Sequence, residues 1–202
     1  MRLNIFPIYW CGAADGQAVG RQPSRLPHLF CLLLTRAILR ETNDQAQSSG
    51  AQMRITIAEV LSPHPIPMGN IRVPGYRIRF ASDLVAGQAI FVPADTQRDQ
   101  LLGQQYVVET GYERIENYRL WTDQDRPAPM IRQLPQLGDY ELMATVKVVM
   151  PLTDAKNRVV VDAIVGEMAF AFTANEIGGD VPRVGDVISC TVRVLSLWDE
   201  AI

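Results

Sequence analysis

The chain has 202 residues, of which 48% are hydrophobic and 20% charged, and its formal net charge is −3. This composition is that of a globular protein with enough chain for one large domain or two small ones. A net charge so close to zero argues against a strong basic field that would attract nucleic acid or anionic lipid to the whole surface. The three cysteines, Cys11, Cys31 and Cys190, lie far apart and indicate neither a disulfide framework nor a zinc site, which fits a cytoplasmic location.

Residues 1–52 differ in pattern from the rest of the chain. The segment 26–40 predicts one short amphipathic helix, whereas residues 41–52 are polar and predict a partly disordered extension. The apolar run in this region is far shorter than the ~20 residues of a membrane-spanning helix, so no membrane association is expected. Regular alternation begins only at Met53, which makes Met53 a candidate natural start. An ordinary flexible extension is the alternative, and on either interpretation we expect residues 1–52 to be dispensable for folding.

From Met53 onward the chain reads as a series of strands. Alternating or short apolar runs predict strands at 53–60, 76–80, 87–94, 104–121, 140–152, 158–165, 167–174 and 186–195. Gly111 is expected at a bulge or bend inside the long segment, and 153–158 is expected to be a hairpin loop. So many short strands with little helical periodicity predict an all-β fold, either two small OB-like barrels in tandem or one merged β sandwich or barrel.

The strands divide into a first β half at 53–125, a proline-rich linker at 126–139 and a second β half at 140–202. The two halves share an order of features, which makes internal duplication a hypothesis and chance similarity its alternative. The matching features are Gly87 and Phe91 with Gly166 and Phe170, "LLGQQYVV" (101–108) with "RVGDVISCTV" (183–192), and Leu-Trp at 120–121 and 197–198.

The second half carries a resemblance to a known type. Its segments "FTANEIGG" (172–179) and "VPRVGDVISCTVRVL" (181–195) resemble an OB-fold barrel, in particular the RNA-binding repeat type of a large ribosomal protein. The resemblance covers roughly residues 140–199, with a weaker echo in 53–121, and it implies an OB-type fold that binds RNA. The sequence departs from that type after the first strand of the repeat, where "LTDAKNRVVVD" replaces the stretch that presents stacking aromatic residues.

Charge counts weigh against nucleic acid as the partner. Residues 53–135 hold nine arginines and nine acidic residues, whereas residues 136–202 hold five basic and ten acidic residues. The half with the better OB pattern is therefore the acidic one, and phosphate binding requires cations. A local binding patch in the first half remains a hypothesis, and a solvated polar strand face is the alternative. The candidate patch residues are Arg77, Arg79, Tyr112, Arg114, Tyr118 and Arg119.

The sequence predicts no catalytic residue, metal site or cofactor. Cys190 alternates in phase with apolar residues, so we expect it in the core, and His64 lies in a proline-rich loop without a second histidine nearby. Acidic residues of two comparable loops, Asp95, Asp99, Glu176 and Asp180, could hold a cation together, but neither loop has calcium-binding spacing. Turn chemistry and solvation are the alternative explanation.

Trp198 near the end of the chain either caps a barrel or anchors a partner protein, since tryptophan is frequent at interface hot spots. The preceding segment 185–195 is predicted to be a central, buried strand. We therefore expect Val192→Ala to be destabilising and Arg193→Ala to have little effect.

The function that the sequence favours is a small, non-enzymatic binding or accessory protein that acts through protein–protein contact. A single-stranded nucleic-acid-binding OB-type protein and an enzyme with a cleft between the two halves are the alternatives. The oligomeric state is left open by the sequence.

Overall fold

The computed structural model describes residues 53–68, 70–94, 100–121, 126–151, 159–178 and 181–201. All regular secondary structure within these residues is β, which confirms the predicted all-β class and its barrel. The extension 1–52 with its expected helix at 26–40, and the expected loop at 153–158, lie outside the described residues.

Each expected strand corresponds to one observed strand, except that the expected segment 104–121 divides into two strands, and four short strands were not expected. They are β1 (Met53–Pro63), β2 (Ile66–Met68), β3 (Ile71–Val73), β4 (Tyr76–Ala81), β5 (Ala86–Val92), β6 (Gln105–Gly111), β7 (Arg114–Trp121), β8 (Met130–Gln133), β9 (Tyr140–Pro151), β10 (Val159–Val165), β11 (Met168–Thr173), β12 (Val187–Arg193) and β13 (Ser196–Asp199).

Five strands form a closed barrel in the order β1-β4-β5-β13-β6. Alternation explains which residues line it. Met53, Ile55 and Ile57 of β1 are buried, while Arg54, which lies between Met53 and Ile55, faces solvent. The pairing of β5 with β13 is parallel, and the other pairs of this barrel are antiparallel. Closure leaves no free edge among the five strands of this barrel.

A second sheet follows the order β11-β10-β9-β12-β7, and β8 pairs with the first residues of β9. The strand β8 lies inside the segment 126–139, so this segment is not a simple linker as expected. β12 lies between β9 and β7, and Ile188, Cys190 and Val192 are buried. The prediction of a central, buried strand is therefore confirmed.

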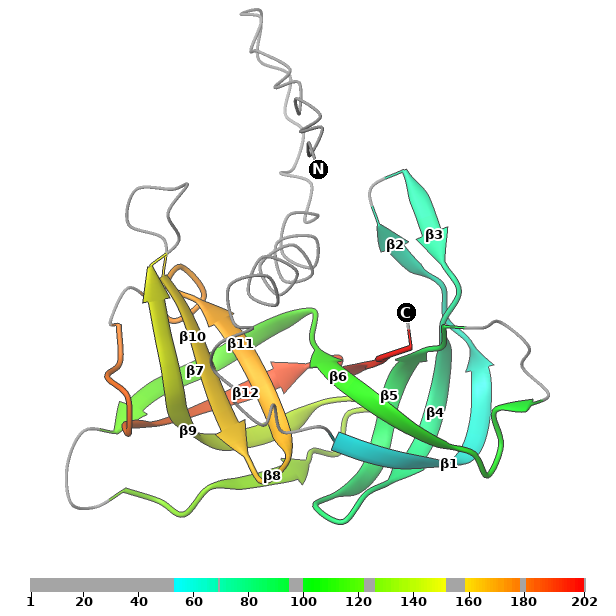
Figure 1. Cartoon of the computed structure of the whole chain (residues 1–202), viewed down its shortest axis with the longest axis horizontal. Coiled ribbons are helices and arrows are strands. Elements are labelled where there is room, and N and C mark those ends of the chain that lie inside the picture. The colour runs from blue at the N-terminus through cyan, green and yellow to red at the C-terminus, as the bar shows by residue number, and fades with distance from the viewer. Residues whose placement is uncertain are drawn as a thin grey trace, which may run out of the picture.

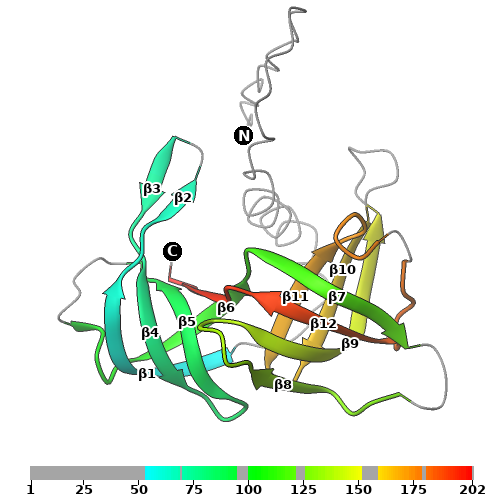
Figure 2. The same ribbon diagram turned by 180° about the vertical axis from the view of Figure 1, so that it is seen from behind.

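Two segments of the chain cross from one sheet to the other. β6 belongs to the closed barrel and β7 to the second sheet, and only two residues separate them. In the same way β12 belongs to the second sheet, whereas β13 returns to the closed barrel. The sequence boundaries 53–125 and 140–202 therefore do not coincide with the two sheets. Figures 1 and 2 show the two crossing segments side by side in the middle of the molecule.

The junction between the sheets is closely packed. The hydroxyl of Tyr140, a fully buried residue of β9, donates a hydrogen bond of 2.9 Å to the backbone oxygen of Gln88 on β5. A Cβ atom at the neighbouring Gly87 would lie 2.2 Å from that hydroxyl, so only glycine permits this approach. The backbone nitrogen of Ile90 donates a bond of 2.9 Å to the oxygen of Leu195. The closed barrel and the second sheet thus share backbone and side-chain hydrogen bonds.

Candidate functional site

The strands β2 and β3 form an arm (residues 66–73) that leaves the closed barrel between β1 and β4. Each strand has three residues, and Ile66 pairs with Val73 while Met68 pairs with Ile71. Within the part of the chain that the structure describes, both strands pair only with each other. Figures 1 and 2 show the arm standing away from the barrel from both sides.

The base of the arm is fixed by a backbone contact. The nitrogen of His64 donates a hydrogen bond of 2.7 Å to the oxygen of Gly75, which holds the two ends of the arm together. A Cβ atom at Gly75 would lie 2.7 Å from the oxygen of His64, so a side chain there would force the base apart. Burial lowers the pKa of His64, and the charge of Arg77 lowers it further while Glu113 opposes this effect. Burial and the charge of Arg77 thus both favour the neutral form of the imidazole.

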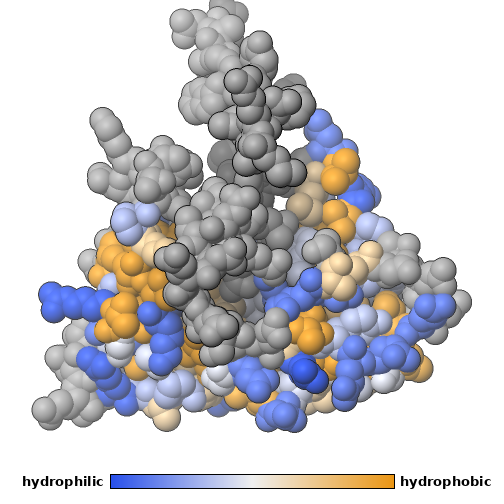
Figure 3. Space-filling model, in the orientation of Figure 1, coloured by the Kyte–Doolittle hydropathy of each residue, from blue (hydrophilic) through white to orange (hydrophobic). Residues whose placement is uncertain are grey.

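The surface of the arm is mainly apolar. Ile71 has 64% of its surface exposed, and Pro67 and Arg72 are exposed beside it. Ile66, Met68 and Val73 are half-buried. Figure 3 shows apolar side chains next to polar ones where the arm projects. Ile71 is thus an exposed large apolar side chain on a two-stranded sheet that no other described strand extends.

A small hollow lies beside the junction between the sheets. Its walls come from β4 and β5 on one side and from the turn before β9 and the end of β12 on the other; the lining residues are Arg77, Gln88, Ala89, Ile90, Leu137, Gly138 and Val194. Its volume of about 50 Å³ holds a few water molecules or the tip of a side chain. Sites for small-molecule ligands usually measure at least ~300 Å³.

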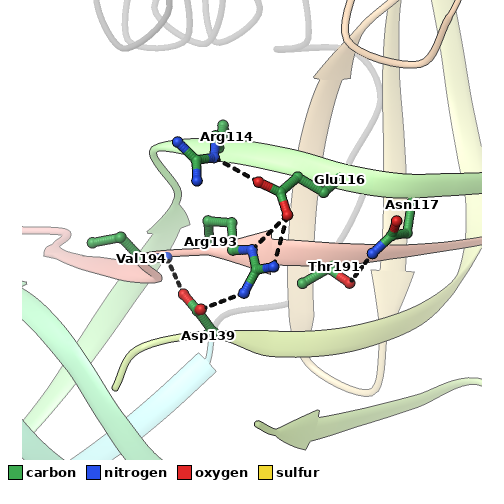
Figure 4. A network of polar contacts seen from close by, with 7 residues as sticks. All are labelled: Arg114, Glu116, Asn117, Asp139, Thr191, Arg193 and Val194. Atoms are coloured by element: carbon green, nitrogen blue, oxygen red, sulfur yellow. Dashed lines mark hydrogen bonds and ion pairs between the residues drawn. The ribbon is translucent and has the colours of Figure 1, made fainter. Parts of the chain in front are cut away.

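An ion-pair network lies next to this hollow (Figure 4). The guanidinium of Arg193 donates to Asp139 at 2.6 Å and to Glu116 at 2.7 Å, and Arg114 donates to the other oxygen of Glu116 at 2.8 Å. These hydrogen bonds and charges, led by the bond from Arg193, lower the pKa of Glu116. The carboxylate of Asp139 also accepts a bond of 3.1 Å from the backbone nitrogen of Val194. The network therefore joins β7, β12 and the turn before β9.

The candidate patch residues of the first half are divided between two sheets. Arg77 and Arg79 lie on the outer face of β4 in the closed barrel, and Arg79 forms an ion pair of 2.7 Å with Glu59. Arg114, Tyr118 and Arg119 lie on β7 in the second sheet. The sequence could not show this division, because it follows from the crossing between β6 and β7.

The arginines on β7 have partners within the same sheet. Arg114 pairs with Glu116, as described above, and the guanidinium of Arg119 lies 3.6 Å from the ring centre of Trp121. Such stacking is a cation–π contact. The indole nitrogen of Trp121 donates a bond of 3.0 Å to the hydroxyl of Ser189. Arg119 and Trp121 thus form an ordered cation–aromatic pair on the second sheet.

Two of the predicted binding residues are buried. Tyr112 is 3% exposed, and its hydroxyl donates a bond of 2.8 Å to the backbone oxygen of Ala171. Burial, with the nearby charge of Glu176 as a smaller cause, raises the pKa of Tyr112 well above its usual value. Trp198 is 9% exposed, and its indole nitrogen donates to Ser196 at 3.1 Å. These positions favour a core role for Tyr112 and the barrel-cap interpretation of Trp198.

The residues considered for catalysis or metal binding do not form a site among the described residues. Cys190 is buried, and burial together with the charge of Glu176 raises the pKa of its thiol to about 12. Glu176 accepts hydrogen bonds from the nitrogen and hydroxyl of Thr173 and so closes a local turn. Asp95, Asp99 and Asp180 lie outside the described residues. Within those residues, no group of three or more histidine, cysteine or acidic side chains is placed to hold a metal ion.

Sequence reasoning missed the arm, the hollow and the Arg193 network. The sequence predicts only a proline-rich loop around His64 at the start of the arm, because strands of three residues are too short for alternation to be recognised. The closely spaced prolines and glycines between residues 63 and 75 were the available signal for an element that projects from the barrel. No sequence pattern predicts the ion pairs of Arg193 with Asp139 and Glu116, because these residues lie 54 and 77 positions from Arg193 along the chain.

Across the described ranges of the chain, no helix has the length and apolar character needed to cross a membrane. Comparison with protein-family models, with curated proteins and with solved structures finds no match to this chain. The resemblance to the ribosomal repeat type therefore stays a prediction.

Proposed function

We propose that this protein is a non-enzymatic binding module that acts through protein–protein contact, and that the arm is its contact element. The observation that carries the proposal is the isolation of β2 and β3 as a separate two-stranded sheet with Ile71 exposed at 64%. A lone two-stranded hairpin is only marginally stable in water. A partner that packs against the arm would bury its apolar residues and stabilise its conformation.

The exposed side chains of the arm indicate which kind of partner surface would fit it. Ile71 and Met68, which pair across the two strands, offer an apolar contact, whereas the exposed Arg72 lies with Pro67 on the opposite face. An apolar groove with acidic residues at its rim would match both properties. The fixed base at His64 and Gly75 holds the arm in place relative to the barrel, which reduces the entropy that is lost on binding.

Affinity capture from the source cells with matched variants tests the proposal. We expect the wild-type protein to retain a stoichiometric protein partner and Ile71→Asp to lose it. Val184→Asp is the control, because Val184 is 65% exposed and lies in the turn before β12, away from the arm. Replacing residues 66–73 by Asn-Gly should also abolish capture, since the ends of the arm already meet and Asn-Gly forms tight hairpin turns. Equal capture by all four proteins would contradict the proposal.

Single-stranded nucleic acid is the second candidate, and the strand order favours it. In the closed barrel the first strand pairs with the second, the second with the third, and the third lies parallel to the last. This order agrees with what an OB-type barrel would have, and in that type the face of the second and third strands binds oligonucleotides. Arg77 and Arg79 of β4 lie on that face.

Fluorescence anisotropy with a labelled mixed-sequence oligonucleotide separates the two candidates. Binding that weakens steeply with salt and is lost in the Arg77→Ala, Arg79→Ala double variant would support nucleic acid. No binding at physiological salt would leave the protein contact as the function.

A further inference from the structure

We propose that the two halves of the chain are two copies of one five-stranded unit, and that the copies have exchanged their last strands. The first unit runs through β1, β4, β5, β6 and β7, and the second through β9, β10, β11, β12 and β13. In the structure β13 completes the sheet of the first unit and β7 completes the sheet of the second. Each sheet therefore contains four strands of one unit and the last strand of the other, and the second sheet contains β8 in addition.

The turns before β6 and β12 are the first support for two equivalent units. Gly103 and Gly185 each lie two positions before their strand, and both have positive φ, at 74° and 92°. The nitrogen of Gly103 donates to the oxygen of Ile57 at 2.8 Å, and the nitrogen of Gly185 donates to the oxygen of Val146 at 2.9 Å. The hydrogen bonds in the opposite direction also correspond. The nitrogen of Ile57 donates to the oxygen of Gln104, and the nitrogen of Val146 donates to the oxygen of Asp186.

The strand registers agree as well. β6 and β12 each have seven residues, and each pairs antiparallel with the first strand of its unit. In the first unit the run of pairs extends from Thr56 with Gln105 to Met53 with Val108. In the second unit the corresponding run extends from Thr145 with Val187 to Leu142 with Cys190. In both units the residue that bonds to the turn directly follows the first paired residue: Ile57 follows Thr56, and Val146 follows Thr145.

A β-bulge occurs at the same place in both first strands. In β1, Ile57 and Glu59 face consecutive residues of β4, so Ala58 is the extra residue. In β9, Val146 and Val148 face consecutive residues of β10, so Lys147 is the extra residue. Each bulge thus follows directly after the residue that bonds to the turn. Bulges are specific features of a fold, and a coincidence of bulge, turn and register indicates two copies of one unit.

The exchange follows from the pairing of the last strands. β13 lies beside β6 with Ser196 opposite Gly111, and β7 lies beside β12 with Arg114 opposite Arg193. Gly111 and Arg193 are the last residues of β6 and β12, so β13 and β7 take equivalent places in the two sheets. Two residues connect each fourth strand to its last strand. Two residues are enough for a hairpin, but each of these connections (112–113 and 194–195, the two hinges) leads instead into the other sheet. A short hinge favours exchange of the strand that follows it.

One of the two hinges is strained. Val194 has a φ of 55°, a left-handed conformation that is unfavourable for a β-branched residue. The bond from its nitrogen to Asp139 and the bonds of Leu195 to Gly138 and Ile90 hold it there. The pairing of β13 with β5 and β6, which closes the barrel, therefore outweighs the local cost at this hinge.

The register also corrects the sequence comparison of the halves. Gly87 lies inside β5 opposite Phe80, whereas Gly166 lies in the turn before β11, so these glycines are not equivalent. The match between 101–108 and 183–192 is the part that agrees with the pairing. The connection between the first two strands of each unit differs: it holds the arm in the first unit, and it is residues 152–158, outside the described ranges, in the second.

Cutting the chain between the units tests the exchange in the full-length protein. A protease site inserted after Ala128, between β7 and β8, yields fragments that carry one unit each. With exchanged strands we expect the cut protein to elute as one species in native gel filtration and to separate only in denaturant. Separation of the two fragments in native buffer would overturn the proposal.

A cysteine pair distinguishes exchange from ordinary adhesion of two separate barrels. Ser196 lies opposite Ile90 in the parallel pair of β13 and β5, so Ser196→Cys with Ile90→Cys should form a disulfide in the folded protein. In an unexchanged chain β13 would lie beside β11, where the strand registers make Thr173 the equivalent of Ile90, and Ser196→Cys would instead pair with Thr173→Cys. A disulfide in the second variant, with none in the first, would overturn the proposal even if the cut fragments stayed together.

Discussion

Arg193 and Asp139 form an ion pair of 2.6 Å in which the carboxylate is almost fully buried. The other oxygen of Asp139 accepts the backbone nitrogen of Val194, so one carboxylate holds both a side chain of β12 and the hinge that follows it. The expectation that Arg193→Ala has little effect is therefore not supported by these contacts. Arg193 does point away from the face of Ile188, Cys190 and Val192, as the alternation predicts, but it meets the turn before β9 there instead of solvent.

Asp139 should be important for stability. Asp139→Ala removes the acceptor of the Val194 nitrogen and one partner of Arg193, and the loss of buried hydrogen bonds typically costs about 1–3 kcal/mol. Asp139→Asn retains the shape and one acceptor oxygen, and it should cost less than the alanine change. Urea unfolding of both variants measures the effect. A free energy of unfolding unchanged in Asp139→Ala would show that the network does not hold the hinge.

Val192 is fully buried in the central strand of the second sheet. Val192→Ala removes two buried methyl groups and should reduce the free energy of unfolding by roughly 1–3 kcal/mol. Arg183→Ala, in the exposed turn before β12, is the matched control and should leave stability unchanged. The burial of Val192 would be refuted if both variants unfolded at the urea midpoint of the wild-type protein.

Tyr112 closes the free edge of β11 through its hydroxyl. Tyr112→Phe keeps the ring, whose centre lies 5.6 Å from that of Phe172, but leaves the oxygen of Ala171 without this donor. We expect a loss of about 1 kcal/mol in unfolding free energy. Tyr112→Leu removes the ring as well and should cost clearly more. Two variants of equal stability would mean that the hydroxyl, and not the ring, accounts for the whole effect.

The protein should lose stability in alkaline solution. The pKa of Cys190 rises from 9.0 to about 12 on folding, so the folded state keeps a proton that the unfolded state releases. The contribution of this thiol is complete below pH 9 and is lost as the pH rises from 9 towards 12, at roughly 1.4 kcal/mol per pH unit. Tyr112, whose pKa is also raised, adds to the loss above pH 10.

Urea midpoints at pH 7 to 10 for the wild-type protein and Cys190→Ala check this pH dependence. The wild-type midpoint should fall between pH 9 and 10, and the variant should show a smaller fall. The same pH dependence in both proteins would be inconsistent with a buried, protonated thiol.

The sequence predicted the local elements well, because strand alternation and turn residues are local signals. It found the start of β1, the bend at Gly111 and the buried face of β12. It could not place β7 and β13, since sheet membership depends on pairing between residues far apart in the chain. The predicted exposure of Tyr112 was wrong for a related reason. β6 ends at Gly111, so the alternation of exposed and buried residues does not continue through Tyr112 to β7.

The candidate site was predicted less well than the fold. Arg77 and Arg79 lie on an exposed face as expected, but Tyr112 and Trp198 are buried because the crossing strands bring them into the packed junction. Exposure of a single aromatic residue depends on which segment covers it, and sequence periodicity does not contain that information. The arm was missed because its strands are so short.

Photo-crosslinking from position 71 tests the central claim most directly. Benzoylphenylalanine in place of Ile71, expressed in the source cells, should give on irradiation one adduct of defined size that contains a partner protein. The same substitution at Val184, which is equally exposed, should not give that adduct. An adduct pattern identical at the two positions, or a nucleic-acid adduct at position 71, would contradict the assignment of the arm as a protein-binding element.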